Sequence, residues 1–509
     1  MKAFKFIFSK FFPMALLMLL QLLVIQFAFA VLNELVWVFQ AVCDVVAMVV
    51  FLKIVNKRTN PEYKIPWIFL ILAIPVFGLT MYALFANPKM KKSDEKKMRK
   101  ILSRVETFTD VDEATRNETY AQMGSYQGVE KYLDNVTEFN GSRNNRVTYY
   151  KVGEEMWADM LTELNKAQHF IFMEYFIVDK GKMWDSIHEI LVRKVAEGVE
   201  VRLMYDDIGT LTMQRHGYWR ELRKEGIDCC KFASFRPVLS GIYNNRDHRK
   251  ILVIDGKVGF TGGINIGDEY INENHRLGHW KDTGVKIEGR AVYNLTALFL
   301  TTFDLTAKED SAYDMYFPAD IPVFAEGGVT HVFGDGPRPY YAEQVAESNF
   351  VNMITSAHNC VWITTPYLIV DYNLASALRN AAMRGVDVRI VTPHIPDKRL
   401  IFDVTRSNYR SLMNAGVKIY EYTPGFIHAK TMVVDGVMAF VGTVNMDYRS
   451  LTHHFEDGVV LFRTPCIDDI VADLTNVFEV SEFIDPETFK MGKVESFFAA
   501  ILQLIAPML

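Results

Sequence analysis

Two stretches of the chain carry the same reactive side chains at the same spacing. "HRKILVIDGKVGFTGGIN" begins at His248, and "HAKTMVVDGVMAFVGTVN" begins at His428. In each stretch the histidine is followed by a lysine, an aspartate, a glycine and an asparagine at matching positions. These residue types suit phosphate chemistry, because an imidazole attacks phosphorus or transfers a proton while ammonium and amide groups bind phosphate oxygens.

The residues between these side chains predict a β-hairpin. Asp255-Gly256 stands between two apolar runs, which is a strong signal for a tight turn. His248 and Lys250 point to the same face of a strand, and the turn brings Asn265 back to their end. Asp255 then lies roughly 20 Å away, at a rise of about 3.3 Å per residue. We therefore expect histidine, lysine and asparagine to form the reactive end, and the aspartate to shape the turn.

The surrounding sequence is also repeated. "AQHFIFMEYFIVD" (167–179) and "AHNCVWITTPYLIVD" (357–371) predict buried strands, and the amphipathic helices that follow them end at Gly198 and Gly385. Alternating strands and helices indicate an α/β fold, with two tandem βαβ repeats and mostly parallel sheets covered by helices. A pseudo-two-fold pair of repeats can place equivalent residues face to face and build one site from two halves.

Three apolar runs of about 20 residues precede the repeats, at 11–32, 35–52 and 67–86. Such runs are long enough to cross a hydrocarbon core of roughly 30 Å, so we expect two or three transmembrane helices. Lys2, Lys5 and Lys10 before the first run also fit a secretory signal, but the run is too long and two more follow it. Asp44 makes 35–52 the weakest candidate. The distribution of basic residues favours a multi-pass protein of the cell membrane with a cytoplasmic body.

The charge of the chain is distributed unevenly. The first 100 residues contain 14 Lys and Arg against 5 Asp and Glu, which leaves 41 against 56 for the remainder. An acidic body argues against nucleic acid as a partner. The basic neck at 89–100 suits anionic lipid headgroups, or is a solvated linker that fixes topology. The five cysteines show no paired spacing and predict neither disulfides nor a zinc site.

These patterns divide the chain into five segments. The predicted boundaries are 1–88 for the transmembrane anchor, 89–145 for the basic neck and linker, 146–310 and 325–485 for the two repeats, and 486–509 for an apolar tail. The tail is apolar on all sides, so it either packs on the body or enters the bilayer.

The repeated motif H-x-K-x4-D-x6-G-x2-N resembles that of the phospholipase D superfamily. The words "TPYLIVD", "RGVDVRIV" and "GTVNMDYRSLTHHFED" resemble the bacterial cardiolipin synthase branch, over roughly residues 150–480. Val370 stands where that branch usually has proline, and "FDLTAK" at 303 lacks an expected tryptophan. The resemblance implies a phosphatidyltransferase that joins two phosphatidylglycerols into cardiolipin and glycerol through a phosphohistidine. It implies no cofactor, no metal, and anionic membrane lipids as partners.

The resemblance also assigns roles to residues. The candidate catalytic residues are those of the two motifs, His248, Lys250, Asp255, His428, Lys430 and Asp435. Four further residues are expected to bind the substrate phosphate or to orient a histidine, namely Asn265, Asn445, Asp282 and Glu456. Family precedent favours His248 as the nucleophile, with the reverse assignment open. The two lysines disfavour imidazolium, which leaves a neutral nucleophile near pH 7.

Other interpretations remain open from sequence alone. A hydrolytic phospholipase D or transfer to another alcohol would use the same residues, and a degenerate membrane scaffold is the non-enzymatic alternative. His275 and His279 fit a loop better than a metal site, and His453 and His454 fit a site wall or packing. Arg449 would contact phosphate or form a structural ion pair.

Overall fold

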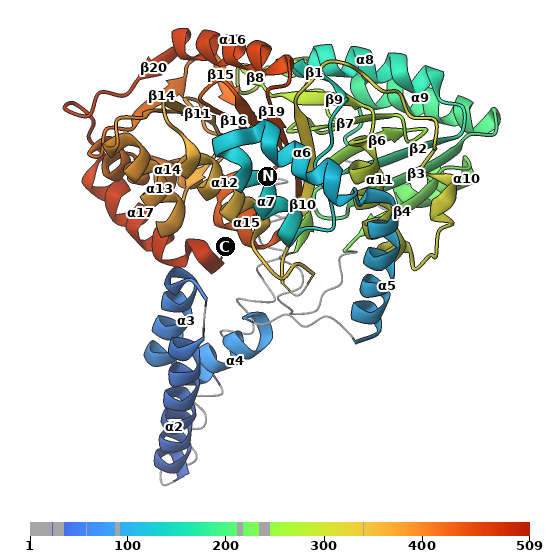
Figure 1. Cartoon of the computed structure of the whole chain (residues 1–509). Helices are drawn as coiled ribbons and strands as arrows, with labels where there is room; N and C mark the ends of the chain where they lie inside the picture. Colours follow the sequence, from blue (N-terminus) through green and yellow to red (C-terminus); the bar gives the residue numbers. More distant parts are fainter. Residues whose placement is uncertain are drawn as a thin grey trace. The chain divides into compact units, whose positions relative to one another are not determined.

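The computed structural model describes residues 23, 35–57, 59–86, 92–210, 217–233, 245–338 and 340–508. The predicted span 11–32 lies outside these residues, apart from Leu23, as do Lys2, Lys5 and Lys10. The chain forms an N-terminal unit that ends at Pro88 and a larger unit that begins at Lys89 (Figure 1).

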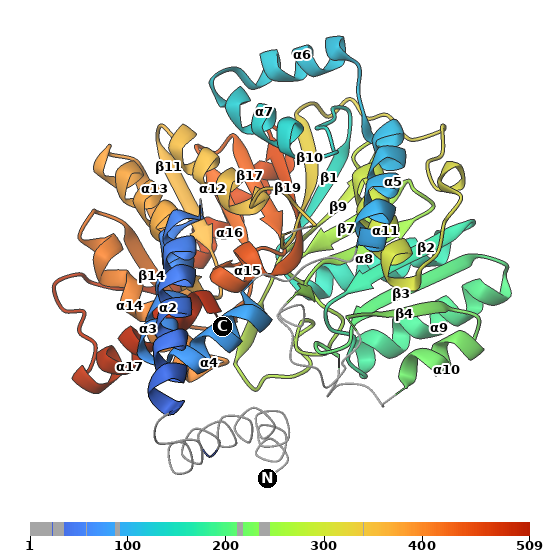
Figure 2. The same cartoon turned by 90° about the horizontal axis from the view of Figure 1, so that it is seen from below.

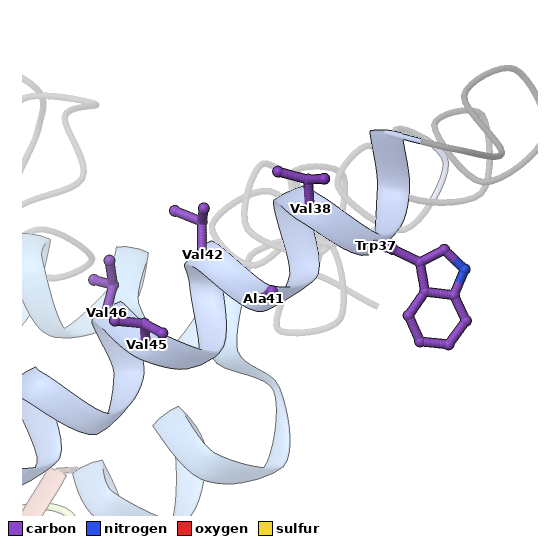
Figure 3. A pocket seen from close by; sticks show the side chains of 6 residues that line it. All are labelled: Trp37, Val38, Ala41, Val42, Val45 and Val46. Carbon is purple, nitrogen blue, oxygen red and sulfur yellow. The ribbon is translucent and has the colours of Figure 1, made fainter.

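The N-terminal unit contains three helices, α2 (Leu35–Asn56), α3 (Pro61–Ala73) and α4 (Pro75–Phe85). Within the described residues, α2 alone is long and apolar enough to cross a membrane, over Trp37–Asn56 with a mean hydropathy of 2.2. Figure 3 shows one of its apolar surfaces, where Trp37, Val38, Val42, Val45 and Val46 project around Ala41. Most of these side chains are exposed. An exposed apolar helix of this length fits a lipid environment.

The predicted span 67–86 is not one helix. Ile74 leaves the helical conformation with φ −140° and ψ 78°, and α4 begins at Pro75. The residue before a proline is disfavoured in the helical region, because the proline ring clashes with its backbone. This stretch therefore forms two short segments, and the multi-pass prediction stays a prediction.

The first repeat contains a seven-stranded sheet, drawn mostly in green in Figures 1 and 2. Strands β2, β3 and β4 pair in parallel, whereas every other ladder in this sheet is antiparallel. The prediction of a mostly parallel sheet was therefore wrong, because the hairpin of the motif and the strands beyond it run back antiparallel. In spatial order the strands are β1 (Arg146–Tyr150), β9 (Gly284–Glu288), β7 (Val258–Gly262), β6 (Lys250–Ile254), β2 (Phe170–Tyr175), β3 (Glu200–Asp206) and β4 (Asp228–Phe232).

The second repeat, drawn in orange and red, has the same arrangement with one extra strand at its edge. Strands β11, β13 and β14 are its parallel part, and they correspond to β2, β3 and β4. The two tandem repeats are therefore related by pseudo-two-fold symmetry. In spatial order the strands are β10 (Val329–Asp335), β19 (His454–Phe462), β17 (Met438–Gly442), β16 (Thr431–Val434), β11 (Cys360–Thr364), β13 (Asp387–Pro393), β14 (Lys418–Tyr422) and β20 (Ser481–Phe483).

Helices cover both sheets, and one apolar core joins the repeats. Buried residues of α11 (Val292–Ala307) and α16 (Cys466–Glu479) pack with side chains from both sheets in a single cluster. Burying this shared surface holds the repeats together as one body. The other helices of the repeats are α8 (Gly153–Lys166), α9 (Lys182–Ala196), α10 (Tyr218–Lys224), α12 (Val345–Ser356), α13 (Tyr372–Met383), α14 (Arg399–Met413) and α15 (Tyr448–Thr452).

The predicted neck and linker form three helices, α5 (Lys92–Thr109), α6 (Glu113–Met123) and α7 (Gln127–Val136). Basic side chains of α5 bind the body: the Lys97 ammonium donates to the Asp304 carbonyl, and Lys100 and Arg104 both pair with Asp310. Part of the basic character of the neck is thus neutralised by the acidic body, so the neck is not simply a solvated linker.

The tail forms α17 (Lys493–Ile505), which has two different faces. One face packs on the body, where Ala499 is fully buried and the Gln503 side chain lies 3.4 Å from the Asn408 side chain. The other face exposes a group of apolar residues, Val494, Phe497, Phe498, Ile501 and Leu504.

Candidate active site

The motif hairpins close on tight Asp-Gly turns. Asp255 and Gly256 have φ values of 53° and 66°, and the Lys257 N–H donates to the Ile254 carbonyl at 3.0 Å. Two consecutive positive φ angles define the turn type that matches strand twist, and Asp-Gly accepts it readily. The Asp255 carboxylate accepts three backbone N–H groups at the start of β2, from Gln168, His169 and Phe170. Asp255 therefore links the turn of the hairpin to the start of β2, the neighbouring strand in the sheet.

The second turn repeats this geometry. Asp435 has φ 54° and accepts the backbone N–H groups of His358, Asn359 and Cys360. It also accepts the Tyr126 hydroxyl at 2.7 Å, from the segment between α6 and α7. Both aspartates are therefore occupied in binding backbone, at the far end of the hairpin from the histidines.

Short parallel strands cross between the repeats and hold the histidines. β5 (Arg246–Asp247) pairs with β19 of the second repeat, and β15 (Gly425–Ile427) pairs with β8 (His279–Lys281) of the first. Each crossing continues into a motif: the His248 N–H donates to the Phe455 carbonyl at 2.8 Å, and the His428 N–H donates to the Lys281 carbonyl at 2.7 Å. The opposite repeat thus fixes each histidine backbone.

The orienting carboxylates are exchanged in the same way. His248 Nδ1 lies 2.9 Å from Glu456 Oε2, and His428 Nδ1 lies 2.6 Å from Asp282 Oδ2. Both carboxylates are fully buried. A neutral imidazole beside a carboxylate donates from Nδ1, which leaves the Nε2 lone pair free. The structure therefore brings together the four predicted residues as two pairs, each with one member from each repeat.

Burial keeps both imidazoles neutral. Burial, together with Lys250 and Lys430 and against the opposite effect of Glu456, lowers the pKa of His248 to about 4. Burial likewise lowers the pKa of His428 to about 4, with Lys430 acting in the same direction. The lysines alone, which the sequence predicts as the cause of the neutral state, are therefore the smaller cause, and burial is the larger one.

The motif lysines lie beside their own histidines. Lys250 Nζ donates to the His248 carbonyl at 2.5 Å, and Lys430 Nζ donates to the His428 carbonyl. Burial lowers the pKa of Lys250 to about 8 and that of Lys430 to about 7. An ammonium has three donors, so each lysine retains capacity for an anion.

The two asparagines differ in their partners. Asn265 is engaged on both sides of its amide: Oδ1 accepts the Ile177 N–H at 3.1 Å, and Nδ2 donates to the Tyr270 hydroxyl at 2.7 Å. The Asn445 Oδ1 atom is buried and has no hydrogen-bond partner among the residues described. The two predicted phosphate-binding amides are thus unequal.

Two hydroxyl groups that the sequence did not predict as site residues also bind Glu456, the carboxylate that pairs with His248. Thr443 Oγ1 donates to Glu456 Oε2 and Ser450 Oγ donates to Glu456 Oε1, both at 2.5 Å. Burial alone would raise the pKa of Glu456, but His248 and His454 hold it well below its usual range. The words "GTVN" and "MDYRS" contain these residues, but their spacing carries no signal for the contact.

Rings border the imidazoles. Phe176 lies 5.1 Å from the His248 ring centroid and Trp280 lies 5.4 Å from that of His428. His279, considered earlier as a metal ligand, lies on β8 with Nδ1 3.0 Å from the Tyr422 hydroxyl. Its polar contact is therefore structural.

Two groups of potential metal ligands occur in the described part of the chain. One contains His248, His454 and Glu456, and the other Glu130, Asp134 and His331. In both groups a histidine Nδ1 already lies 2.9 Å from a carboxylate oxygen, which is a hydrogen-bonding distance.

Comparisons with known proteins agree with this geometry. A family profile described as "Cardiolipin synthase, PLD-like domain" matches residues 160–291 and 350–480. A second, described as "Phospholipase_D-nuclease N-terminal", matches residues 45–87. The two matches of the first profile contain one motif each.

Similar sequences extend over most of the chain. An uncharacterised protein of Streptococcus mutans is 38% identical, covering 90% of this chain and 99% of its own. Proteins named cardiolipin synthase from Halalkalibacterium halodurans and Alkalihalophilus pseudofirmus are each 34% identical, covering 87% and 89% of this chain and 88% and 90% of their own. The crystal structure of phosphatidylserine synthase from Haemophilus influenzae shares the fold, with a TM-score of 0.57 at 12% identity, covering 76% of this chain and 98% of that one.

Proposed function

The chain belongs to the family of cardiolipin synthases with phospholipase D-like domains and is a phosphatidyltransferase, and we propose that it joins two phosphatidylglycerols into cardiolipin and free glycerol. The observation that carries this proposal is the crossed pairing of His248 with Glu456 and of His428 with Asp282. It gives one site two oriented imidazoles, one to attack phosphorus and one to carry a proton, and a double displacement at phosphorus requires both.

In the first step, Nε2 of one imidazole attacks the phosphorus of the donor lipid. The bond from phosphorus to the glycerol headgroup breaks, and the other imidazole, in its protonated form, gives its proton to the leaving oxygen. An imidazole with a pKa of about 4 is a poor proton carrier at neutral pH. The bound phosphate anion raises the pKa of this imidazole, because a nearby negative charge favours the protonated form.

In the second step, a hydroxyl of the second phosphatidylglycerol attacks the phosphohistidine. The imidazole that gave up its proton now takes one from this hydroxyl, and the bond from phosphorus to nitrogen breaks. One phosphodiester replaces another, so the reaction is near balance and needs no nucleotide. The resemblance favours His248 as the attacking residue and His428 as the acid and then base.

The remaining motif residues stabilise the charge of the transferred phosphate. We assign its non-bridging oxygens to Lys250, Lys430, Asn265 and Asn445, whose positive charge and N–H groups oppose the charge that develops there. The four residues lie on the hairpins that carry the histidines. Asp255 and Asp435 act at a distance, by holding these hairpins in place.

The lipid substrates require contact with a membrane. We propose that α2 anchors the enzyme in the cell membrane, with the body on the cytoplasmic side, and that the exposed apolar face of α17 enters the same lipid surface. Anionic lipids such as phosphatidylglycerol are its expected partners.

Product analysis tests the proposal. Purified protein given phosphatidylglycerol labelled in the phosphatidyl group, without CTP, should release glycerol and form labelled cardiolipin in equal amounts. Phosphatidic acid as the main product would instead identify a hydrolase. Unchanged turnover in His248→Ala would contradict the mechanism as a whole.

A further inference from the structure

The pseudo-two-fold relation exposes a chemical difference between the two halves of the site. Equivalent motif residues are 180 positions apart, as His248 and His428 are, and the orienting acids Asp282 and Glu456 are 174 apart. These offsets identify three equivalent pairs that differ in chemistry, namely Arg246 with Phe426, Arg449 with Glu269, and His454 with Trp280. The half next to His248 has two arginines and a histidine at these positions, and all three side chains carry nitrogen atoms that can donate to an anion.

Two of these basic residues border His248 directly. Arg246 on β5 lies opposite His454 on β19 in the parallel ladder. Side chains alternate along a strand, so both point to the face that also carries His248 and Glu456. The ring centroids of His454 and His248 are 5.4 Å apart. Arg246 and His248 are two residues apart on an extended strand, so their Cα atoms are separated by about 6.6 Å.

Both side chains are buried with unused polar atoms. Arg246 is 3% exposed; its Nη1 lies 3.2 Å from Asp206 Oδ1, its Nε donates to the Asn245 carbonyl, and its Nη2 has no partner within the described ranges. The His454 Nε2 atom is likewise buried without a partner there. Leaving such buried groups unpaired destabilises the protein, and a bound anion would offset this cost.

Arg449 adds a charge that a ligand can reach. It lies on α15, four residues after Asn445, and its side chain is exposed. It forms no ion pair with any residue that the structure describes, so the alternative of a structural ion pair is not realised. The Arg449 carbonyl accepts the His453 N–H at 2.9 Å, so Arg449 lies at the end of β19 that carries His454.

The other half of the site is unsuited to a second anion. The Trp280 and Phe426 rings lie 4.8 Å apart, and the Trp280 ring lies 5.4 Å from His428. The remaining position holds Glu269, whose charge would repel a phosphate. Aromatic faces beside a carboxylate suit a neutral polyol such as glycerol.

We propose that Arg246, Arg449 and His454 form a second phosphate subsite, which binds the phosphodiester of the second phosphatidylglycerol while its glycerol hydroxyl reacts. The inference rests on the proposed synthase function, in which two phosphates joined by one glycerol must be held at once. Guanidinium groups bind such anions with paired N–H donors.

The subsite accounts for acceptor choice. Water and small neutral alcohols reach the phosphohistidine as easily as a lipid hydroxyl does, but they leave Arg246 and Arg449 without an anion. A phosphate-bearing acceptor gains the energy of that contact and is held in position to attack. The enzyme should therefore prefer acceptors that carry a phosphate.

A competition between two soluble acceptors tests the subsite. The full-length protein in detergent receives phosphatidylglycerol together with equimolar glycerol and glycerol 3-phosphate, each with a different isotope label. The wild type should transfer to glycerol 3-phosphate at least about tenfold faster than to glycerol, a ratio worth about 1.4 kcal/mol. Arg449→Gln should bring the ratio close to one, and Arg449→Lys should restore part of it.

Matched variants separate the outcomes. Arg410→Gln, which removes an exposed arginine of α14, should leave the acceptor ratio unchanged. Arg449 is exposed, so its substitution carries little risk of unfolding, unlike that of the buried Arg246. A wild type without preference, or a preference that survives Arg449→Gln, would overturn the subsite while leaving transfer itself intact. Transfer to neither acceptor would overturn the transferase function instead, and the subsite with it.

Discussion

At the scale of single residues, the site depends on matching each histidine to an acid of the opposite repeat. Neither half has a complete pair of its own, because Glu456 serves His248 and Asp282 serves His428. The sequence predicted that these four residues belong to the site, since they recur at equivalent positions. It did not predict the exchange, because the spacing within one repeat carries no information about which strand the other repeat contributes.

The shifted pKa values predict the pH dependence of kcat/KM. The attacking imidazole must be neutral, so activity falls on the acid side as His248 is protonated near its pKa of about 4. The lysines must be charged, so activity falls on the alkaline side through the pKa values of Lys430 and Lys250, about 7 and 8. The profile of the free enzyme is therefore a bell between these limits.

Initial rates of p-nitrophenol release from a limiting donor lipid with a p-nitrophenyl headgroup, whose leaving group needs no proton from His428, give this profile from pH about 4 to about 9. In Lys430→Arg the alkaline limb should move upward, because a guanidinium stays charged across this range. An alkaline limb at the same pH in this variant would show that Lys430 does not set it.

At the scale of elements, the hairpins were predictable and the crossings were not. Asp-Gly between apolar runs is a local signal, and both turns form as expected. β5 and β15 are two and three residues long, too short to show any periodicity. Their pairing with β19 and β8 is set by packing between repeats. Pro75 is a local signal for the end of a helix, but the run 67–86 was predicted as one span because of its length.

The turn aspartates should matter for stability. Asp255→Ala removes the acceptor of three backbone N–H groups and places alanine at φ 53°, so we expect a loss of about 2–4 kcal/mol in the free energy of unfolding. Asp255→Asn should lose less, because asparagine tolerates positive φ and keeps one acceptor oxygen.

Denaturant unfolding of the detergent-solubilised protein measures both losses. Asp314→Ala, at an exposed position, serves as the control and should be near neutral. If Asp255→Ala were as stable as this control yet inactive, the aspartate would have a chemical role that the structure does not indicate.

At the scale of the whole molecule, the two repeats and the apolar helix α2 together suit an enzyme that acts on lipids. In the proposed mechanism, duplication supplies an attacker and a proton carrier to one phosphorus. The shared core of α11 and α16 fixes the halves as one body. The composition of the sequence indicated the anchor, and its periodicity indicated the repeats. Sequence offsets reveal the asymmetry next to His248, but only the structure shows that Arg246 and His454 lie opposite one another.

The exposed face of α17 should help present the body to lipid. Phe497→Ser with Phe498→Ser removes two apolar side chains, each worth about 1.5–3 kcal/mol when fully buried, so KM for vesicle-borne phosphatidylglycerol should rise at least about tenfold. KM for a short-chain phosphatidylglycerol dispersed in water should change much less. Met383→Ser, on an exposed site of α13, is the control. An equal rise with both substrates would indicate a packing defect rather than lost membrane contact.

The central claim is that one histidine of each motif acts on the same phosphorus. A donor lipid with a p-nitrophenyl headgroup tests this directly, because its leaving group needs no proton. His428→Asn should then release one equivalent of p-nitrophenol in a burst and retain a phosphatidyl group on His248, detectable by mass spectrometry, whereas His248→Asn should give neither. A burst in His248→Asn alone would exchange the two roles. No burst and no adduct in either variant would contradict the account.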